Sequence, residues 1–420
     1  MKVQLARLAA RGALSRIPHG SLTVTEPDGR EHHYGHGQPA AAMKLNSELA
    51  WPAFLRGSLS LSEAYADGLW DSPDLVSLVR LGACNMPALD RMRDRLAPLL
   101  RPAELVRALR RPEGPEQSRR DIAAHYDLGN QLFTRMLDPS LTYSCAIFER
   151  PGMSLEEAQR AKLDRVCRKL GLAPGLRVLE IGSGWGSFAL YAATNYGCHV
   201  TTATISHEQY EYVQGLVNAA GLEELVTVLF EDYRRLDGRY DRLVSIEMIE
   251  AVGWRGFGTF LAKCAELLKD DGAMLLQAIT IDERAYAHER ASRSFIKEYI
   301  FPGGSLPSLS ILLDRLARRT DLQVVDLADI TAHYIETLRQ WREAFLSNLS
   351  ELQQLGYEER FCRIWTLYLA YCEAGFAERR ICDVQLLLVK PAFQSTAPSA
   401  GTAQPELRPI TDDPTVSSHR

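Results

Sequence analysis

The chain has 420 residues, 46% of them hydrophobic and 24% charged, with a formal net charge of −5. The length predicts two domains, the composition is that of a globular protein, and the negative charge argues against a dedicated nucleic-acid binder. No apolar run reaches the roughly 18 residues that a membrane-spanning helix needs.

The eight cysteines include no C-x-x-C pair, so neither a zinc site nor a thioredoxin-type site is indicated, and we predict no bound metal. The N-terminal apolar residues are interrupted by Arg7, Arg11 and Arg16, which is not the pattern of a secretory signal. We therefore expect a cytoplasmic protein with free thiols, which can meet a membrane only from its surface.

Residues 1–110 predict a small α+β domain that is mostly helical, with helices at about 1–17, 62–68 and 74–83 and a β segment at 21–39. A basic stretch at 89–111 follows, with seven arginines against three acidic residues. Residues 1–120 carry 17 Lys and Arg against 13 Asp and Glu. We expect this domain to dock on the anionic inner surface of a membrane, although a solvated helix face also fits the basic stretch.

Residues 111–119 are polar and rich in Pro and Gly, which predicts a linker. From 120 to 392, strand and helix patterns alternate, as is typical of a doubly wound parallel sheet of the Rossmann type. Residues 393–420 are rich in Pro, Ser and Thr and predict a disordered tail. We expect strands at 177–182, 199–205, 226–232, 239–246, 273–281, 322–327 and 383–389, and a long helical region at 336–378.

A glycine-rich turn follows the first of these strands. Gly182, Gly184 and Gly186 stand between strand and helix, where the backbone can approach a ligand closely. The dinucleotide pattern G-x-G-x-x-G is absent, because the third glycine comes two residues after the second. Glu180 is placed to bind the amino group of a methionine moiety. The turn, with Ser183 inside it, therefore favours S-adenosylmethionine as the ligand.

Polar residues also follow the next three strands, at the edge where open α/β sheets bind ligands. The second strand ends without an acidic residue. At the end of the third strand, Asp232 is placed to bind an adenine amino group and Tyr233 to stack on the adenine ring. Glu250 follows the fourth strand. The cofactor candidates after the second and third strands are Thr204, Ile205, Ser206, Gln209, Asp232 and Tyr233.

Five further segments are specific in type and order. They are H-Y-D-L-G-N at 125–130, L-T-Y-S-C-A at 141–146, Y-I-F-P-G-G-S-L-P-S at 299–308, H-Y-I-E-T-L-R-Q-W-R at 333–342 and C-E-A-G-F at 372–376. With them, residues 15–391 resemble the cyclopropane-fatty-acyl-phospholipid synthase family, which includes the mycolic acid cyclopropane synthases. G-L-W-D at 68–71 is similar to the N-terminal module of the members that modify phospholipids.

The resemblance implies a Rossmann-like class I methyltransferase domain, preceded by the smaller lipid-docking domain. It implies S-adenosylmethionine as methyl donor and an unsaturated phospholipid as acceptor, and it suggests a homodimer at the inner membrane surface. In the family, the cis double bond of an acyl chain takes the methyl group, and the resulting carbocation loses a proton as a cyclopropane ring closes.

Related enzymes hold a bicarbonate ion as the base. The resemblance places its ligands here at the Cys145 backbone, Glu250, Gln277, Ile279 and Tyr334. It also matches Tyr143 and Ser144 to residues that cover the cofactor, and Cys372 to a cysteine assigned to the active site.

Two departures leave alternatives open. Gln277 and Ala251 stand where better-known synthases have histidines, and a glutamine can donate to an anion but cannot titrate. Loss of a different proton would give a methylene- or methyl-branched chain. A small-amine N-methyltransferase of the same fold, and a lipid-binding protein without catalysis, are the remaining alternatives.

Overall fold

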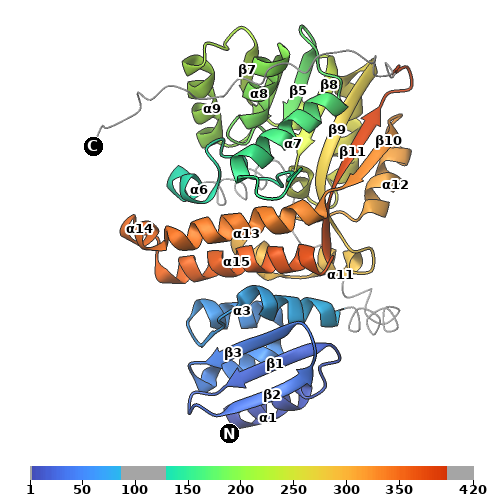
Figure 1. Cartoon of the computed structure of the whole chain (residues 1–420). Helices are drawn as coiled ribbons and strands as arrows, with labels where there is room; N and C mark the ends of the chain where they lie inside the picture. The colour runs from blue at the N-terminus through green and yellow to red at the C-terminus, as the bar shows by residue number, and fades with distance from the viewer. Residues whose placement is uncertain (1, 87–128, 395–420) are drawn as a thin grey trace.

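The computed structural model describes residues 2–86, here the N-terminal part, and residues 129–394, the second part (Figure 1). The basic stretch at 89–111, the predicted linker at 111–119 and the predicted tail from residue 395 onward lie outside the described residues. The two parts are stacked along one axis, with the N-terminus at the end away from the second part.

A four-stranded sheet with helices packed beside it makes up the N-terminal part. Its elements are α1 (Lys2–Leu14), β1 (Gly20–Thr25), β2 (Glu31–His36), β3 (Ala40–Leu45), η1 (Glu48–Ala50), α2 (Trp51–Arg56), α3 (Ser58–Ala66), β4 (Trp70–Asp71) and a helix over residues 75–86. The strand order is β2-β1-β3-β4, so the predicted β segment at 21–39 is an antiparallel hairpin with β3 added in parallel to β1. Arg7 and Arg11 of α1 pair with the buried Glu26 after β1, which holds α1 against the sheet.

A seven-stranded sheet of order β10-β11-β9-β8-β5-β6-β7 forms the centre of the second part. Its strands are β5 (Arg177–Ile181), β6 (His199–Thr204), β7 (Val226–Phe230), β8 (Tyr240–Ile246), β9 (Leu268–Ile281), β10 (Gln323–Asp329) and β11 (Ile381–Val389). The Rossmann-like α/β fold is confirmed, and β11, whose direction the sequence did not indicate, runs antiparallel to both β9 and β10. The chain reaches β11 from helices beyond the carboxyl ends of the parallel strands, so it re-enters the sheet from that edge and runs back.

Helices cover both faces of this sheet. Neighbouring residues of a strand point to opposite faces, so the central strands are apolar along most of their length. Val178 and Val244 pack with α7 (Leu155–Lys169), α8 (Ser187–Tyr196) and α9 (His207–Ala219). Leu179 and Leu243 pack with α10 (Phe257–Leu267) and α12 (Leu309–Arg319) on the other face.

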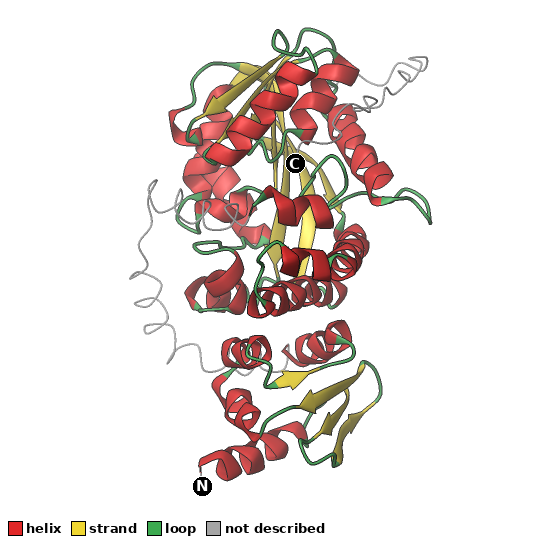
Figure 2. Cartoon of the chain, turned by 90° about the vertical axis from the view of Figure 1, so that its left-hand side faces the viewer, coloured by secondary structure: helices red, strands yellow, loops and turns green. Residues whose placement is uncertain are grey.

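Three helices lie between the sheet and the N-terminal part, as Figures 1 and 2 both show. They are α13 (Thr331–Ser347), α14 (Leu349–Gln354) and α15 (Glu359–Ala377). The predicted single helical region at 336–378 is therefore interrupted, and Gly356, at a φ of +97°, makes the turn before α15. The remaining elements of this part are α6 (Asn130–Met136), η2 (Tyr233–Arg235), η3 (Ile249–Val252), α11 (Tyr286–Ala291) and the π-helical turn η4 (Ile296–Ile300).

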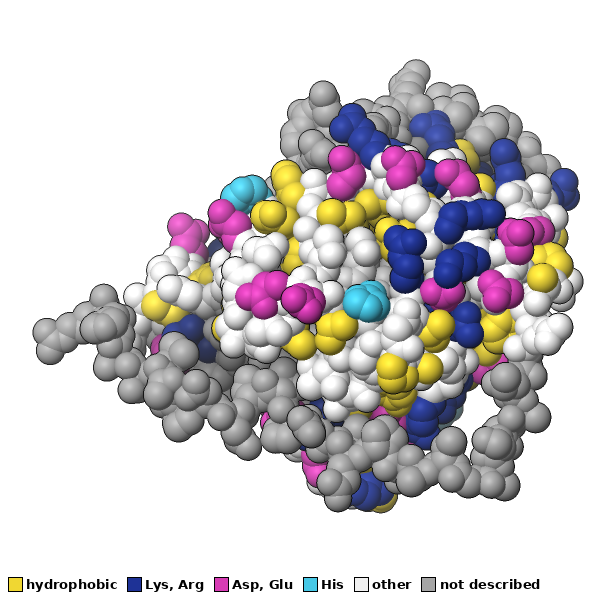
Figure 3. All heavy atoms as spheres, turned by 90° about the horizontal axis from the view of Figure 1, so that it is seen from above, with side chains coloured by type: hydrophobic (Ala, Val, Ile, Leu, Met, Phe, Trp, Pro, Cys, Tyr) yellow, Lys and Arg dark blue, Asp and Glu magenta, His cyan; other side chains and the backbone are white. Residues whose placement is uncertain are grey.

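The end of the second part that points away from the N-terminal part has a solvated surface. Figure 3, seen from that end, shows Lys and Arg side chains interspersed with Asp and Glu. Charges mixed in this way are typical of a surface that faces water.

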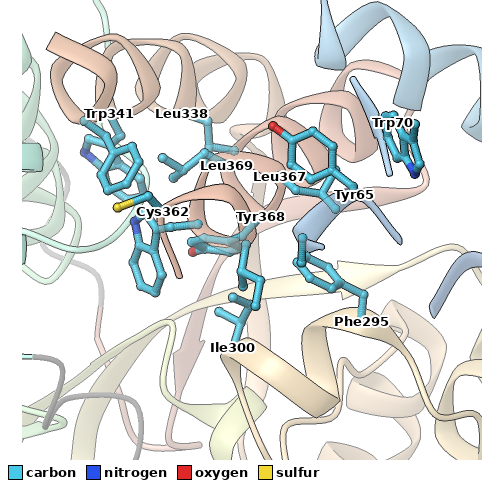
Figure 4. Packing of buried hydrophobic residues seen from close by; sticks show 14 of the residues in the cluster. Tyr65, Trp70, Phe295, Ile300, Leu338, Trp341, Cys362, Leu367, Tyr368 and Leu369 are labelled. Atoms are coloured by element: carbon cyan, nitrogen blue, oxygen red, sulfur yellow. The ribbon is translucent and has the colours of Figure 1, made fainter. Parts of the chain in front are cut away.

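Arg363 of α15 connects the two parts. Its guanidinium donates to the carbonyls of Tyr65 and Trp70 at 2.7 and 3.0 Å and to the Asp71 carboxylate at 2.7 Å. It also lies 4.2 Å from the centre of the Tyr65 ring, a cation–π contact. Around it, Tyr65 and Trp70 belong to the same apolar cluster as Phe295 (Figure 4).

We predict that Arg363→Ala lowers the free energy of unfolding by about 1–3 kcal/mol, because two carbonyls and a carboxylate lose a charged donor. Arg360→Ala is the matched control on the same helix. The Arg360–Asp67 pair is half exposed, at 47% and 53%, so its loss costs about 0–1 kcal/mol. Urea unfolding of both variants measures the difference, and equal effects would contradict this account.

Candidate active site

A cavity of about 650 Å³ opens at the carboxyl ends of the parallel strands. Most of the predicted site residues line it: Tyr143, Ser144, Glu180, Gly182, Ser183, Gly184, Thr204, Ile205, Gln209, Asp232, Tyr233, Glu250, Ile279, Tyr334 and Cys372. Cys145, Gly186, Ser206 and Gln277 are not among the lining residues, but each hydrogen-bonds to one that is.

The glycine-rich turn forms one wall of this cavity. Gly182, Gly184 and Gly186 have φ values of +98°, +50° and +88°, a backbone conformation that favours glycine. A Cβ on Gly182 would lie 3.0 Å from the Met248 side chain, whereas a Cβ on Gly184 would meet nothing within 4 Å. Gly184 therefore faces open space, and the turn is shaped so that a ligand can approach its backbone.

Glu180 lies beneath this turn on β5. The side chain is buried, and one carboxylate oxygen accepts a hydrogen bond of 2.6 Å from the Thr202 hydroxyl on β6. Burial raises the pKa of Glu180 to about 8, so the carboxyl is mostly protonated at neutral pH. A cationic group in the cavity would favour its ionised form.

The polar residues after β6 and β7 are largely held by one another. Gln209 accepts from the Thr204 hydroxyl at 2.8 Å, and the Ser206 hydroxyl accepts from the backbone of Gln209 at 3.3 Å as the N-cap of α9. Asp232 accepts from the Arg234 guanidinium at 2.6 Å, and the Tyr233 ring meets Phe260 edge-on at 5.2 Å. These contacts fix the wall where the adenosine moiety is expected.

Two glutamates, Glu247 and Glu250, lie three residues apart after β8, and only Glu250 was among the predicted site residues. Glu247 accepts from the Cys145 backbone N–H at 2.8 Å, from Gln277 Nε2 at 2.7 Å and from the Tyr334 hydroxyl at 2.6 Å. The backbone N–H of Ile279 donates to Glu250 at 2.5 Å. The only available signal was that Glu247 and Glu250 both follow β8, at the ligand-binding edge.

Glu250 keeps one carboxylate oxygen free of any hydrogen-bond partner among the described residues, although that atom is buried. Burial, with a smaller contribution from the neighbouring Glu247 charge, raises the pKa of Glu250 to about 8. An unpartnered polar atom in a buried site is costly, so its place in the cavity wall suggests contact with a ligand.

Cys145 and Cys372 lie in different places, but both thiols keep their proton. The Cys145 thiol is fully buried, and burial raises its pKa well above the ordinary value. Cys372, on α15, lines the cavity, and burial raises its pKa to about 12. Both thiols are neutral at pH 7, and neither is suited to attack a substrate. Cys145 contributes to the site through its backbone.

The other end of the cavity is walled by both parts of the chain, and apolar side chains there stand beside polar ones such as Ser62 and Lys297. Leu61, Trp70, Leu78, Val79 and Ala83 come from the N-terminal part. The second part adds Ile296, Phe301, Leu367 and Tyr368. We call this end the apolar arm. The sequence alone did not indicate that the N-terminal part would line the same cavity as the glycine-rich turn.

Comparison with known proteins fits this geometry. The family model described as mycolic acid cyclopropane synthetase matches residues 114–386. Tuberculostearic acid methyltransferase UfaA1 of Mycobacterium tuberculosis is 39% identical over 345 residues, which is 80% of this chain and 79% of that protein. Cyclopropane-fatty-acyl-phospholipid synthase of Escherichia coli K12 is 38% identical over 357 residues, 83% of this chain and 86% of its own length.

Among solved structures, mycolic acid cyclopropane synthase CmaA1 in complex with SAH and CTAB is 34% identical. Its TM-score is 0.62, and the match covers 66% of this chain and 99% of that one. The chain belongs to the mycolic acid cyclopropane synthetase family. It is therefore an S-adenosylmethionine-dependent methyltransferase that acts on lipid chains.

The residues present fit this methyl donor. The open space at Gly184 admits a ligand beside the turn, and Glu180 beneath it matches an amino group. Within residues 2–86 and 129–394, no three His, Cys, Asp or Glu side chains are grouped to hold a metal ion. Over the same ranges, no helix combines the length and apolar character needed to cross a bilayer.

Bicarbonate, in contrast, does not fit the site. Of the groups expected to bind it, the Cys145 N–H, Gln277 and Tyr334 all donate to Glu247, and the Ile279 N–H donates to Glu250. These donors are already engaged by the protein's own carboxylates, and a bicarbonate ion would have to displace those carboxylates to bind here.

We predict that binding of S-adenosylhomocysteine releases a proton below pH 8. Glu180 holds a proton in the free protein, since its pKa is about 8, and the ligand's ammonium group lowers that pKa. Affinity should therefore rise between pH 6 and pH 8 and then level off. Calorimetry in buffers of different ionisation enthalpy measures the released proton.

Glu180→Gln should abolish this pH dependence and weaken binding about 10- to 100-fold, the loss of a hydrogen bond to a charged group. Glu211→Gln, which changes an exposed carboxylate on α9, is the control and should behave as the unchanged protein. An unaltered pH slope in Glu180→Gln would show that another group binds the ammonium.

Proposed function

We propose that the protein transfers the methyl group of S-adenosylmethionine to the cis double bond of an unsaturated phospholipid acyl chain and forms a cyclopropane ring. One observation carries the proposal: a single cavity joins the glycine-rich turn to the apolar arm. A donor at the turn and an alkyl chain in the arm would meet beside Glu247, Glu250 and Tyr334, which line the same cavity.

The similar proteins support a long amphiphilic substrate. CmaA1 was solved with SAH and CTAB, and the relatives named above are, by their names, a tuberculostearic acid methyltransferase and a cyclopropane-fatty-acyl-phospholipid synthase. The 357-residue match to the Escherichia coli synthase extends well beyond residues 114–386, whereas CmaA1 covers 66% of the chain. A shared N-terminal part favours a phospholipid acceptor.

The chain's own residues position the reactants and protect the intermediate. When bound, S-adenosylmethionine supplies an electrophilic methyl group. An alkene is a weak nucleophile, so the enzyme must gain rate from alignment and from exclusion of water. Tyr334 and Phe376 line the cavity, and aromatic rings beside the reacting chain would stabilise a carbocation.

We further propose that the N-terminal part contacts an anionic membrane surface. Leu5 and Leu8 lie one turn apart on α1 and are 61% and 68% exposed. Leu49 and Leu55, on η1 and α2, are also more than half exposed. Apolar side chains, combined with the arginine-rich stretch at 89–111 that follows in the sequence, suit the interface of an anionic bilayer.

The experiment uses S-adenosylmethionine labelled with ¹³C in its methyl group and vesicles of dioleoylphosphatidylglycerol or dioleoylphosphatidylcholine. Cyclopropane and methylene-branched chains have equal mass, so NMR of the extracted lipids must locate the label. Label in a ring CH₂ supports the proposal. Label in a branch supports the alternative favoured by the relative UfaA1. Unlabelled acyl chains would reject both. Sedimentation with the anionic vesicles only would support membrane docking.

We predict that Gly82→Phe blocks the apolar arm. Gly82 lines the cavity, and a Cβ there would meet nothing within 4 Å, so the new ring would fill space that we assign to the acyl chain. Turnover of dioleoyl lipid should fall at least about tenfold, the effect of 1.4 kcal/mol, with binding of S-adenosylhomocysteine unchanged. Gly215→Phe, on α9 with free space at its Cβ and outside the cavity lining, is the control. Equal turnover in both variants would place the acyl chain elsewhere.

A further inference from the structure

We propose that the Glu247 carboxylate occupies the position of bicarbonate in this enzyme and is the base that deprotonates the methylated acyl chain. The inference rests on the proposed function and adds the identity of the base. The groups expected to donate to bicarbonate donate to the Glu247 carboxylate instead.

The carboxylate of Glu247 collects the donors that an anion at this point requires. Oε1 accepts from the Cys145 N–H and from Gln277, and Oε2 accepts from Tyr334, at 2.6–2.8 Å. These donors come from three segments far apart in the chain: a loop, β9 and α13. Gln277 is in turn fixed by Gln385 of β11, which donates to its amide oxygen at 3.1 Å.

The backbone at Glu247 is an independent sign of a special role. Its φ is +49°, the left-handed region, which costs a non-glycine residue about 1–2 kcal/mol. Glycine would relieve this strain, yet a glutamate stands here, and three hydrogen bonds converge on its carboxylate. Strain of this kind persists where the surrounding structure holds a residue in place, as at functional sites.

The charge at this point is shared with Asp383 of β11. Gln277 Nε2 donates to both carboxyl groups, and Asp383 keeps one buried oxygen without a partner among the described residues. Burial and the neighbouring Glu247 charge raise the pKa of Asp383 well above its usual range. Burial also raises the pKa of Glu247, but the hydrogen bonds from Tyr334 and Cys145 oppose this shift, so Asp383 is the carboxyl of the pair that keeps its proton more firmly.

Glu247 lines the cavity and so has access to the reacting chain. In the first step, the alkene π electrons form a bond to the methyl carbon while the S–CH₃ bond breaks, leaving S-adenosylhomocysteine and a carbocation on the adjacent carbon. Glu247 then takes a proton from the new methyl group, and the C–H electron pair closes the ring. The reaction consumes no further reagent, and Glu247 ends it protonated.

The first test needs no variant. Dialysed protein with S-adenosylhomocysteine is titrated with ¹³C-bicarbonate and followed by NMR, without lipid, so its result does not depend on the acceptor. We expect no signal from bound bicarbonate. In a separate assay with lipid, we expect turnover in bicarbonate-free buffer to be about equal to turnover with 10 mM bicarbonate. A bound signal, or turnover that depends on bicarbonate, would overturn the proposal.

The second test uses two substitutions of the same residue. Glu247→Gln should lower kcat by about 10²- to 10⁴-fold, the usual contribution of a general base, with little change in KM. Glu247→Gly should fold, since glycine suits this φ, and should gain both bicarbonate binding and partial recovery of turnover with bicarbonate. Wild-type rates in Glu247→Gln, or no gain of bicarbonate binding in a folded Glu247→Gly, would contradict the assignment. Glu211→Gln is again the control.

Failure of this inference differs from failure of the proposed function. Unlabelled acyl chains in the vesicle experiment would reject the proposed phospholipid acceptor. The titration with bicarbonate would still show whether the protein binds that ion or uses Glu247 in its place. Methylated lipid together with a bicarbonate requirement would keep the function and reject Glu247 as the base.

Discussion

A buried carboxylate in an apolar cavity is the constraint on which this site depends. A charge removed from water costs several kcal/mol unless donors surround it. Glu247 meets this requirement with donors from three segments, and Tyr334 thereby ties α13 to the end of β8. The same hydrogen bonds that stabilise the charge fix the helices that close the cavity.

Burial raises the pKa of all three glutamates around the cavity, but their hydrogen-bond partners differ. Glu180 has one hydroxyl partner and Glu250 one backbone partner, and both have a pKa raised to about 8. Glu247 has three donors and a neighbour that holds a proton. When acidic groups in one site have different surroundings, their proton affinities differ. One group can then bind a ligand while another acts as a base.

Much of the fold could be predicted because it rests on local patterns. Apolar strands, the glycine-rich turn and Glu180 are read within a few residues of one another. The reversed direction of β11 depends on where α15 ends in space, and Glu247 becomes notable only when β9 and α13 bring Gln277 and Tyr334 to it. The lining of the apolar arm by Leu78 and Val79 likewise depends on how the two parts pack.

The α15 helix has two faces with separate tasks. Arg360 and Arg363 reach the N-terminal part, while Tyr368, Cys372 and Phe376 line the cavity. Because the same helix makes both contacts, ligand binding and the packing of the N-terminal part are thermodynamically linked. If a ligand in the cavity shifts α15 and so changes the free energy of its contact with the N-terminal part, that contact changes the ligand's own binding free energy by the same amount.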